Sequence, residues 1–525
     1  MMKAELRDSL EFIYSDSVVR EKPCREMTLD VARGGTLSAH ILLNDIEAGS
    51  EIGFVLRKVG RVVQAASWFR LVDVPVEANT GPYHFIERAD QRNEFVTRRA
   101  PFCVFDAMEP VRSFVKGEAP IVALRVQVPV SRNEKPGRHT FTVEIMAAGQ
   151  KVSLTLSAVV HKAIIPEAGA KTFPYTNWFN FDYIATRHGL EPWSASHWRM
   201  IERYAGLMAH ARQNTFWCPL QHIFSIKDGI PMLNRRRLRR IVDIFTRAGM
   251  YFIEGGHLAG GSGGEWQGKA FDVVLTKIRA TTSEGNAILA AMTGLLMDEI
   301  RRNGWQNRWI QHVTDEPGAA NAVDYRILVG MVHKYMPGIP LLDATMDTSL
   351  VGSVDIWCPQ AQEFQGHKAE FEAQRKIGDR VWFYTCCAPG GPWLNRLLDM
   401  ELLRPALMGW GAALFGLDGY LHWGLNHYQP DQNPFHKSVV SDGGSNFWPA
   451  GDTHVVYPGK EGPWSSVRLE AQREGFEDYE LLKRLKANNP NLADKVIHQA
   501  IRGFDDYTKD MGTFRAARKA LLNAL

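Results

Sequence analysis

The hydrophobic rhythm of the chain changes near residue 165, and this change constrains the fold more than any other feature of the sequence. Before it, apolar and polar residues alternate with period two in segments such as TLSAHILLN, IVALRVQVPV, RHTFTVEIMA and KVSLTLSAVV. Turn signals such as RGG, NTG and KPG separate these segments. The pattern is typical of antiparallel strands that bury one face, so we predict an N-terminal β-sandwich domain over residues 1–165.

After the linker HKAIIPEAGAKTFP, short apolar strands alternate with long amphipathic helices. Eight candidate strands, from FPYTNWFNFD to LDGYLHWGLN, fit a (β/α)8 barrel of the TIM type. The connection TSLVGS between the fifth and sixth strands is too short for a full helix, so the count of eight stays open. We therefore predict a multidomain protein whose second domain, residues 166–525, is a barrel with a closing C-terminal helical segment.

The bulk properties limit the classes of partner. A chain of 525 residues with 45% apolar and 23% charged content is expected to fold into two globular domains. The net charge of +3 argues against a nucleic-acid partner, and we interpret the basic run RRRLRR as a solvated helix face. No segment has the roughly 18 consecutive apolar residues of a membrane span. The start, MMKAELRDSLEFIYSDS, lacks an apolar leader, which favours a cytoplasmic protein; a secreted or periplasmic one is the alternative if a leader has been removed.

No metal or cofactor is predicted. The six cysteines show no CxxC spacing, so we interpret them as buried reduced thiols rather than a disulfide framework or a zinc knuckle. The histidines of HWGLNHYQPDQNPFH lack the two-histidine helical spacing of a metal site. The glycines of GGHLAGGSGG are not followed by Gly-Lys-Ser/Thr, which excludes a phosphate cradle of the P-loop kind.

Two adjacent acid pairs occur close together, in GLLMDEIRR and in WIQHVTDEPG. Asp298 and Glu299 fall on a predicted helix beside two arginines, and we interpret them as a solvated, ion-paired face. Asp315 and Glu316 fall where the fourth predicted strand ends and its loop begins. Because barrels build their active sites at the carboxyl ends of the strands, we predict that Asp315 and Glu316 are the catalytic pair.

The other predicted strand ends carry aromatic, amide and imidazole side chains. Aromatic faces with polar edges suit a sugar, whose C–H patches stack while its hydroxyls form hydrogen bonds. Glu254, at the end of the third strand, is a candidate third acid that we rank below the pair. The residues that we predict to bind the substrate are Trp178, His222, His312, Trp357, Tyr384, Trp423 and Asn426.

Six stretches of the second half together resemble glycoside hydrolase family 123 and its uncharacterised relatives. They are NWFNFD, HWRMIERYAGLMAHARQNTFWCPL, HVTDEP, WFYTCCAPGGPWLNR, GYLHWGLN and RLEAQREGFEDYELL. The resemblance runs from about Phe173 to Leu485, and HVTDEP followed by GYLHWG is fairly specific. The N-terminal half has no comparable motif, although a β-sandwich before the barrel is what the resemblance implies.

The resemblance implies a mechanism. Known members of the family remove terminal β-N-acetylgalactosamine with retention and use the acetamido oxygen of the substrate as the nucleophile. By this resemblance, Asp315 would orient the acetamido group and stabilise an oxazolinium-like intermediate. Glu316 would protonate the leaving oxygen and then act as base for the incoming water. Adjacent acids are compatible with such substrate assistance, since no enzyme nucleophile is needed across the bond, and the charge of Asp315 is expected to raise the pKa of Glu316.

Other functions stay open at this stage. The enzyme alternatives are a hexosaminidase that prefers N-acetylglucosamine and a hydrolase of a sulfated or otherwise modified amino sugar. From a different class, the chain could be a carbohydrate-binding barrel without catalysis, although the intact acid pair argues against this. The partner expected in every case is a carbohydrate, with a terminal 2-acetamido sugar in the first, and the oligomeric state, including a homo-oligomer, is left open.

Overall fold

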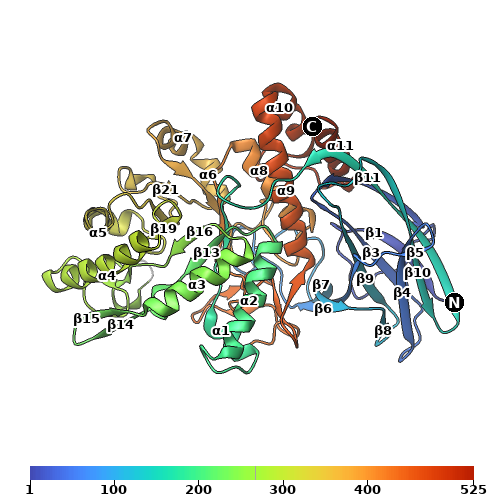
Figure 1. The fold of residues 1–525 in the computed structure, drawn as a ribbon, viewed down its shortest axis with the longest axis horizontal. Helices are drawn as coiled ribbons and strands as arrows, with labels where there is room; N and C mark the ends of the chain where they lie inside the picture. Colours follow the sequence, from blue (N-terminus) through green and yellow to red (C-terminus); the bar gives the residue numbers. More distant parts are fainter. Residues whose placement is uncertain (266–267) are drawn as a thin grey trace.

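The computed structural model describes residues 1–265 and 268–525, and it consists of an antiparallel sheet part and an α/β part (Figure 1). The first part is built from eleven strands. Their bounds are β1 Lys3–Asp8, β2 Glu26–Arg33, β3 Thr36–Asn44, β4 Glu51–Lys58, β5 Arg61–Val62, β6 Ser67–Val76, β7 Phe102–Val111, β8 Phe114–Lys116, β9 Val122–Pro129, β10 Gly137–Ala147 and β11 Gln150–Ile164.

These strands form two sheets that share one apolar core. One sheet has the order β1-β3-β9-β6-β7 and the other β2-β11-β10-β4-β5, with β8 paired to β4. All of these pairs are antiparallel except β2 with β11. Ile41 and Leu124 of the first sheet are buried in the same cluster as Phe54 and Leu156 of the second. The N-terminal antiparallel sheet domain predicted from the period-two pattern is therefore present; its boundary at residue 165 stays a prediction.

A hairpin from the far end of the chain extends the first sheet. Strands β27 (Tyr457–Pro458) and β28 (Pro463–Ser466) follow β7 in the strand order, with Ser465 opposite Met108. This pairing joins segments more than 350 residues apart, and no local pattern in the sequence indicates it. The sheet part is thus completed by residues that lie beyond the strands of the α/β part.

The α/β part contains parallel strands at eight positions. They are β12 Tyr175–Asn177, β13 Thr215–Cys218, β16 Phe252–Gly255, β19 Trp309–His312, β20 Leu341–Asp343, β21 Ile356–Trp357, the interrupted strand β22 Arg380–Val381 with β23 Phe383–Tyr384, and β24 Tyr420–His422. One ladder has the order β13-β16-β19-β20-β21-β22 and a second has β12-β24-β23. Among the described residues no ladder joins β12 to β13. The predicted α/β domain is present, whereas a hydrogen-bonded, closed barrel stays a prediction.

Helices and small hairpins form the connections between these strands and the segment that follows β24. The helices are α1 Phe181–Arg187, α2 Ala195–His210, α3 Arg235–Ala248, α4 Ser283–Arg302, α5 Ala322–Tyr335, α6 Ala361–Gly366, α7 Lys368–Lys376, α8 Leu403–Phe415, α9 Val467–Asn488, α10 Pro490–Ala500 and α11 Met511–Asn523. The hairpins are β14 Phe224–Lys227 with β15 Ile230–Leu233, β17 Ala259–Gly261 with β18 Phe271–Val273, and β25 Val440–Ser441 with β26 Phe447–Trp448. A single 3₁₀ turn, Thr348–Leu350, takes the place of a helix between β20 and β21.

Helix α9 connects the two parts of the molecule, and it lies between them in Figure 1. Although it carries the charged motif RLEAQREGFEDYELL, most of it is buried. Arg468 donates to Asp106 of β7 over 2.9 Å, and both side chains are fully buried. Glu470 accepts a hydrogen bond of 2.9 Å from Gln127 of β9. The charges of this motif therefore join the sheet part to the α/β part.

Two predictions about surface and thiol residues need correction. Glu299 is not on a solvated face: its side chain is fully buried and pairs with Arg235 and Arg239 of α3. The reason is that α3 packs beside α4, so that Arg235 and Arg239 of the basic run RRRLRR cover the Glu299 carboxylate. The cysteines are all free, but Cys24, Cys103 and Cys387 are only partly buried rather than buried. No helix within residues 1–265 or 268–525 is long and apolar enough to cross a membrane.

The buried pairing of Glu299 gives a stability prediction. The hydrogen bond from Arg239 is the main cause that lowers the pKa of Glu299 to about 2, with Arg235 contributing as well. Its stabilisation is therefore present above pH 4.5 and lost as the pH falls through 2. Glu299→Gln is expected to reduce the free energy of unfolding at pH 7 by about 1 kcal/mol, because Arg235 and Arg239 are 31% and 45% exposed and water can solvate their guanidinium groups once the charge of Glu299 is removed.

Urea denaturation of the wild type and Glu299→Gln at pH 7 and pH 3 measures this effect. The difference between the two proteins should shrink at pH 3. Asp298→Asn is the matched control, because Asp298 is exposed on the same helix and should change stability little. Equal stabilities of Glu299→Gln and the wild type at pH 7 would contradict the pairing.

Candidate active site

The acid pair follows the end of β19, and a neighbouring strand fixes the backbone that leads to it. Asp343, at the end of β20, accepts hydrogen bonds from the backbone N–H groups of Val313 (3.0 Å) and Thr314 (3.2 Å). The Tyr325 hydroxyl donates to the other carboxylate oxygen of Asp343 over 2.5 Å. Because these groups are buried, the segment before Asp315 is held in one position.

Glu316 has an unusual backbone conformation and a defined partner. Its φ of 44° lies in the left-handed region, which a side chain other than glycine adopts at a cost. The Tyr384 hydroxyl, from β23, donates a hydrogen bond to Oε1 of Glu316. Asp315, by contrast, has 48% of its side chain exposed. The two neighbouring carboxylates therefore face different surroundings: one is held against β23 and the other is open to solvent.

These surroundings make Glu316 a suitable proton donor. Burial, and then the charge of Asp315, raise the pKa of Glu316 to about 7, while the Tyr384 hydrogen bond acts in the opposite direction. A carboxylic acid with this pKa is still substantially protonated near neutral pH, as a general acid must be. The effect of Asp315 has the direction expected from the sequence, although burial is the larger cause.

The raised pKa of Glu316 predicts the pH dependence of the activity. If the protonated form is the active one, kcat/KM should fall tenfold per pH unit above about pH 7. This alkaline limb of the pH profile should be absent in Glu316→Gln, because the glutamine side chain has no proton to lose in this range. The measurement is kcat/KM between pH 4 and pH 9 on a substrate with a poor leaving group. An alkaline limb near pH 4.5 in the wild type would show that Glu316 is not the group in control.

A buried histidine lies between two carboxylates behind the pair. His312 Nε2 is 2.8 Å from Glu254 and its Nδ1 is 3.3 Å from Asp343. Burial lowers the pKa of His312, but the hydrogen bonds and charges of Asp343 and Glu254 outweigh it and raise the pKa to about 9. Glu254 also accepts a hydrogen bond of 2.9 Å from the Trp178 indole. Glu254 Oε1 therefore fixes both Trp178 and His312, whereas Oε2 is buried without a hydrogen-bond partner, and the side chain has no exposed surface.

A cavity of about 850 Å³ adjoins Asp315. Its lining includes Trp217, Gln221 and His257, together with the β17–β18 hairpin. Trp217 stacks on Trp178 with ring centres 4.3 Å apart and an interplanar angle of 21°. His257 Nε2 lies 3.9 Å from Asp315 Oδ1 and is buried without a hydrogen-bond partner. The Trp217 ring, the Asp315 carboxylate and the unpaired His257 Nε2 give this cavity the chemistry of a sugar site.

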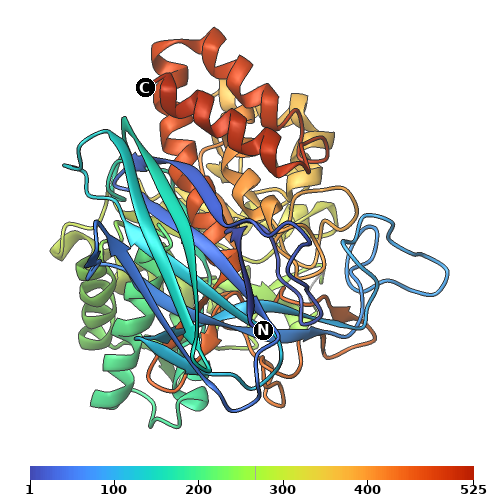
Figure 2. The ribbon, with the colours of Figure 1, turned by 90° about the vertical axis from the view of Figure 1, so that its right-hand side faces the viewer.

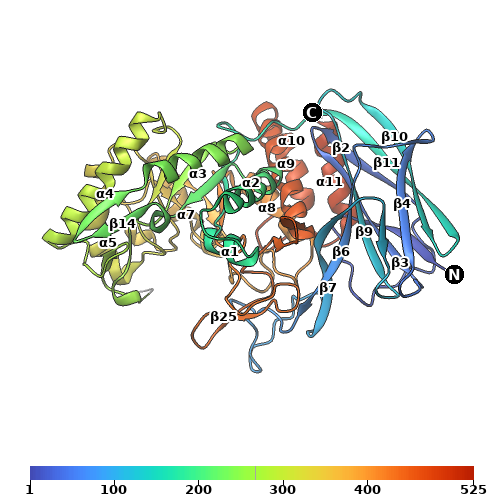
Figure 3. The same ribbon diagram turned by 60° about the horizontal axis from the view of Figure 1, so that its bottom comes forward.

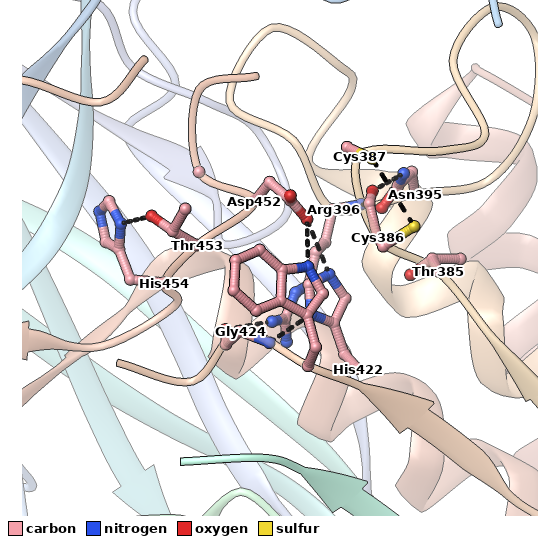
Figure 4. Close-up of polar contacts among 12 residues, drawn as sticks. Thr385, Cys386, Cys387, Asn395, Arg396, His422, Gly424, Asp452, Thr453 and His454 are labelled. Carbon is pink, nitrogen blue, oxygen red and sulfur yellow. Dashed lines mark hydrogen bonds and ion pairs between the residues drawn. The ribbon is translucent and has the colours of Figure 1, made fainter. Parts of the chain in front are cut away.

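Trp217 and Asp452 were missed by the sequence reasoning. Trp217 lies within the predicted strand NTFWCPLQH, and its position near the carboxyl end of that strand was the available signal; in the structure it pairs with Glu254 in the parallel register. Asp452 follows the last strand in an irregular segment, and no sequence pattern marks it. It accepts a hydrogen bond of 3.2 Å from the Trp423 indole and lies close to His422 (Figure 4). Burial raises the pKa of Asp452 to about 7, although Arg396 and Trp423 act against this.

The structure brings three of the predicted binding residues together. Tyr384 belongs to an apolar cluster at the strand ends, and Trp178 and Trp423 pack against it. Met346 packs against the same cluster and lies 3.3 Å from the Tyr384 hydroxyl. Side chains from the first, fifth, seventh and eighth strand positions therefore meet beside Glu316.

Four predicted binding residues are held in other contacts. His312 is fully buried in the ion cluster described above. Trp357 is also buried, and its indole donates to Asp379 because the ring points outward to α7. Asn426 is buried, and its side-chain amide accepts a hydrogen bond from the Asn180 N–H and donates one to the Asn180 carbonyl. His222 packs on Phe181 and Trp193 near α1. None of these four lines the cavity beside Asp315. Within the described residues no group of three or more His, Cys, Asp or Glu side chains could hold a metal ion.

Comparisons with known proteins give a family model that matches part of the chain and a solved structure with the same fold. The family model for the glycoside hydrolase 123 catalytic domain matches residues 265–485. A family 123 glycoside hydrolase from Clostridium perfringens, studied for glycolipid glycan hydrolysis, is similar over 100% of this chain and 96% of its own, with 13% sequence identity and a TM-score of 0.74. At this identity the structural match shows a shared fold. The family resemblance inferred from the motifs is thus confirmed.

Other solved structures are more distant. The xylanase 10B modules from Clostridium thermocellum match with a TM-score of 0.35 and 10% identity, covering 90% of this chain and 93% of theirs. An endo-β-1,4-mannanase from Thermotoga petrophila matches with a TM-score of 0.39 and 10% identity, covering 59% and 77%. Neither is similar enough to inform the chemistry of this chain. No curated protein matches the sequence.

Proposed function

We propose that this chain, a glycoside hydrolase with a family 123 catalytic domain, is a retaining exo-enzyme that releases terminal β-linked N-acetylgalactosamine. In this proposal the acetamido group of the substrate supplies the nucleophile. The C. perfringens relative is described as acting on glycolipid glycans, and we extend this substrate class to the present protein.

The observation that carries the proposal is the contrast between the two acids. Glu316 is half-buried, bonded to Tyr384 and has a pKa of about 7, whereas Asp315 is exposed beside the cavity. A direct-displacement enzyme needs a second carboxylate across the scissile bond, about 5–5.5 Å from the acid. The side chains of the nearby acids Glu254, Asp343 and Asp452 have no exposed surface, whereas the side chain of Asp315 is 48% exposed, so Asp315 is the neighbouring carboxylate that a substrate can reach. This arrangement favours substrate assistance.

The proposed reaction has two steps. In the first, the acetamido oxygen attacks the anomeric carbon, and Glu316 gives its proton to the departing glycosidic oxygen. Asp315 accepts the acetamido N–H and stabilises the positive charge of the oxazolinium ring that forms. In the second, Glu316 takes a proton from water, whose oxygen attacks the anomeric carbon and reopens the ring. The two inversions give overall retention.

A panel of para-nitrophenyl β-glycosides tests the function. We expect the 2-acetamido galactoside to be cleaved and its 2-hydroxy counterpart to be inert, and proton NMR should show the β anomer of the sugar first. Faster cleavage of the N-acetylglucosaminide would favour the hexosaminidase alternative. Cleavage of none of the glycosides, with sugar binding retained, would favour the non-catalytic barrel. An α anomer as first product would contradict retention.

A further inference from the structure

A second cleft, of about 530 Å³, lies where the sheet part meets the α/β part. One wall belongs to the loop that joins β6 to β7, residues 77–101, and the other to the β25–β26 hairpin. We call this the aromatic cleft, because Tyr83 and Phe447 on opposite walls are 71% and 42% exposed. Its polar lining includes His84, Arg88, Gln91 and Asn446.

The 77–101 loop projects from the sheets in Figure 2, yet it is firmly attached to the α/β part. The buried Asp399 carboxylate accepts hydrogen bonds from the Thr80 backbone (2.7 Å), the Thr80 hydroxyl (2.8 Å) and the Asn79 amide (3.2 Å). At Gly390 two segments of the chain approach each other so closely that a Cβ on Gly390 would lie 2.0 Å from the Gly81 carbonyl oxygen. The wall that carries Tyr83 is therefore positioned by contacts with the α/β part.

Each wall of the aromatic cleft contacts a segment of the candidate active site. The Phe85 N–H donates to the Cys387 carbonyl (3.1 Å), three residues after the Tyr384 that binds Glu316. On the other wall, Phe447 is followed by Trp448, whose ring centre lies 5.1 Å from that of Trp423. Figure 3 shows the β25 hairpin beside the lower end of the sheet part. The walls of the aromatic cleft thus contact the segment that follows β23, whose Tyr384 binds Glu316, and Trp423 at the end of β24.

The position of the aromatic cleft relative to the acid pair matters because the two acids have different proposed roles. Asp315 faces the 850 Å³ cavity with Trp217 and His257, where an acetamido sugar would be bound. Glu316, the proposed proton donor, must lie towards the leaving oxygen. In an exo-enzyme everything beyond that oxygen is leaving group, and further sugars of a glycan would extend towards the aromatic cleft.

We propose that the aromatic cleft binds the sugar residues on the leaving-group side of the cleaved bond. Exposed aromatic rings on facing walls suit stacking against sugar C–H faces, and the guanidinium and amide groups beside them suit hydroxyl groups. This inference rests on the proposed function, and it gives the N-terminal sheet domain a part in substrate selection.

The test compares two substrates in each variant. One is the para-nitrophenyl 2-acetamido glycoside, whose aglycone is too short to fill the cleft; the other is an oligosaccharide ending in β-linked N-acetylgalactosamine. We expect Tyr83→Ala and Phe447→Ala each to lower the ratio of kcat/KM for the oligosaccharide to that for the aryl glycoside about tenfold, through KM. Tyr83→Trp, which keeps a stacking ring, should preserve the ratio.

Phe114→Ala is the matched control, since Phe114 is 50% exposed on β8 of the other sheet. Its ratio should equal that of the wild type. An unchanged ratio in Tyr83→Ala and Phe447→Ala, whether or not both rates fall, would overturn the proposal. Failure of the wild type to cleave the aryl glycoside would instead refute the proposed function, so the two failures are distinguishable.

Discussion

Glu316→Gln is expected to lower kcat/KM on the order of 10²–10⁴-fold for substrates whose leaving group is a sugar, and much less for activated aryl glycosides. A sugar alkoxide is a poor leaving group, so its departure depends on the proton that Glu316 supplies. A nitrophenolate leaves with little help, and its release should be partly spared. Burial and the neighbouring charge of Asp315 keep this proton available near neutral pH.

Steady-state kinetics on a series of aryl glycosides with leaving groups of rising pKa measures the effect. The defect of Glu316→Gln should grow with the pKa of the leaving group. Asp298→Asn, in the other acid pair, is the control and should be nearly silent, since Asp298 is exposed on α4. A Glu316→Gln enzyme with full activity on every leaving group would contradict the assigned role.

Asp315→Asn is expected to cost a similar factor, on the order of 10²–10⁴, but with a different pattern. The amide would support the developing positive charge of the acetamido group less well, and this charge forms with good and poor leaving groups alike. The loss should therefore be large across the whole series. The variant also removes a like charge beside Glu316, so the alkaline limb should move to lower pH while staying above pH 4.5, since burial remains.

The same kinetic series, repeated across pH, checks both features of Asp315→Asn. A loss confined to poor leaving groups would mean that Asp315 and not Glu316 assists the leaving oxygen. An unmoved alkaline limb would mean that Asp315 does not influence the proton of Glu316.

The sequence predicts which strand ends meet, because the carboxyl ends of parallel strands lie on one side of a sheet. This reasoning placed Tyr384 and Trp423, which are far apart in the chain, beside the loop that carries Glu316. It failed on the direction of individual side chains. In strands of two to four residues the period-two pattern is too short to set the inward face, so the sequence does not distinguish the outward Trp357 from a binding residue.

The remaining differences come from contacts between segments that are distant in the chain. Glu299 is buried because α3 covers it, and the β27–β28 hairpin is a strand pair only because β7 lies beside it. Asp452 contacts the site because the segment after β24 folds back and brings its carboxylate within hydrogen-bond distance of the Trp423 indole. None of these contacts leaves a local signal in the sequence, since each depends on how segments that are distant in the chain pack together.

The central claim is that the acetamido oxygen of the substrate is the nucleophile. Aryl glycosides whose N-acetyl group carries zero, one, two or three fluorine atoms test it directly, because each fluorine withdraws electrons from that oxygen. We predict that kcat/KM of the wild type falls steeply and steadily along this series. A rate that does not depend on the number of fluorine atoms would show that the acetamido oxygen does not attack, and the account would be wrong.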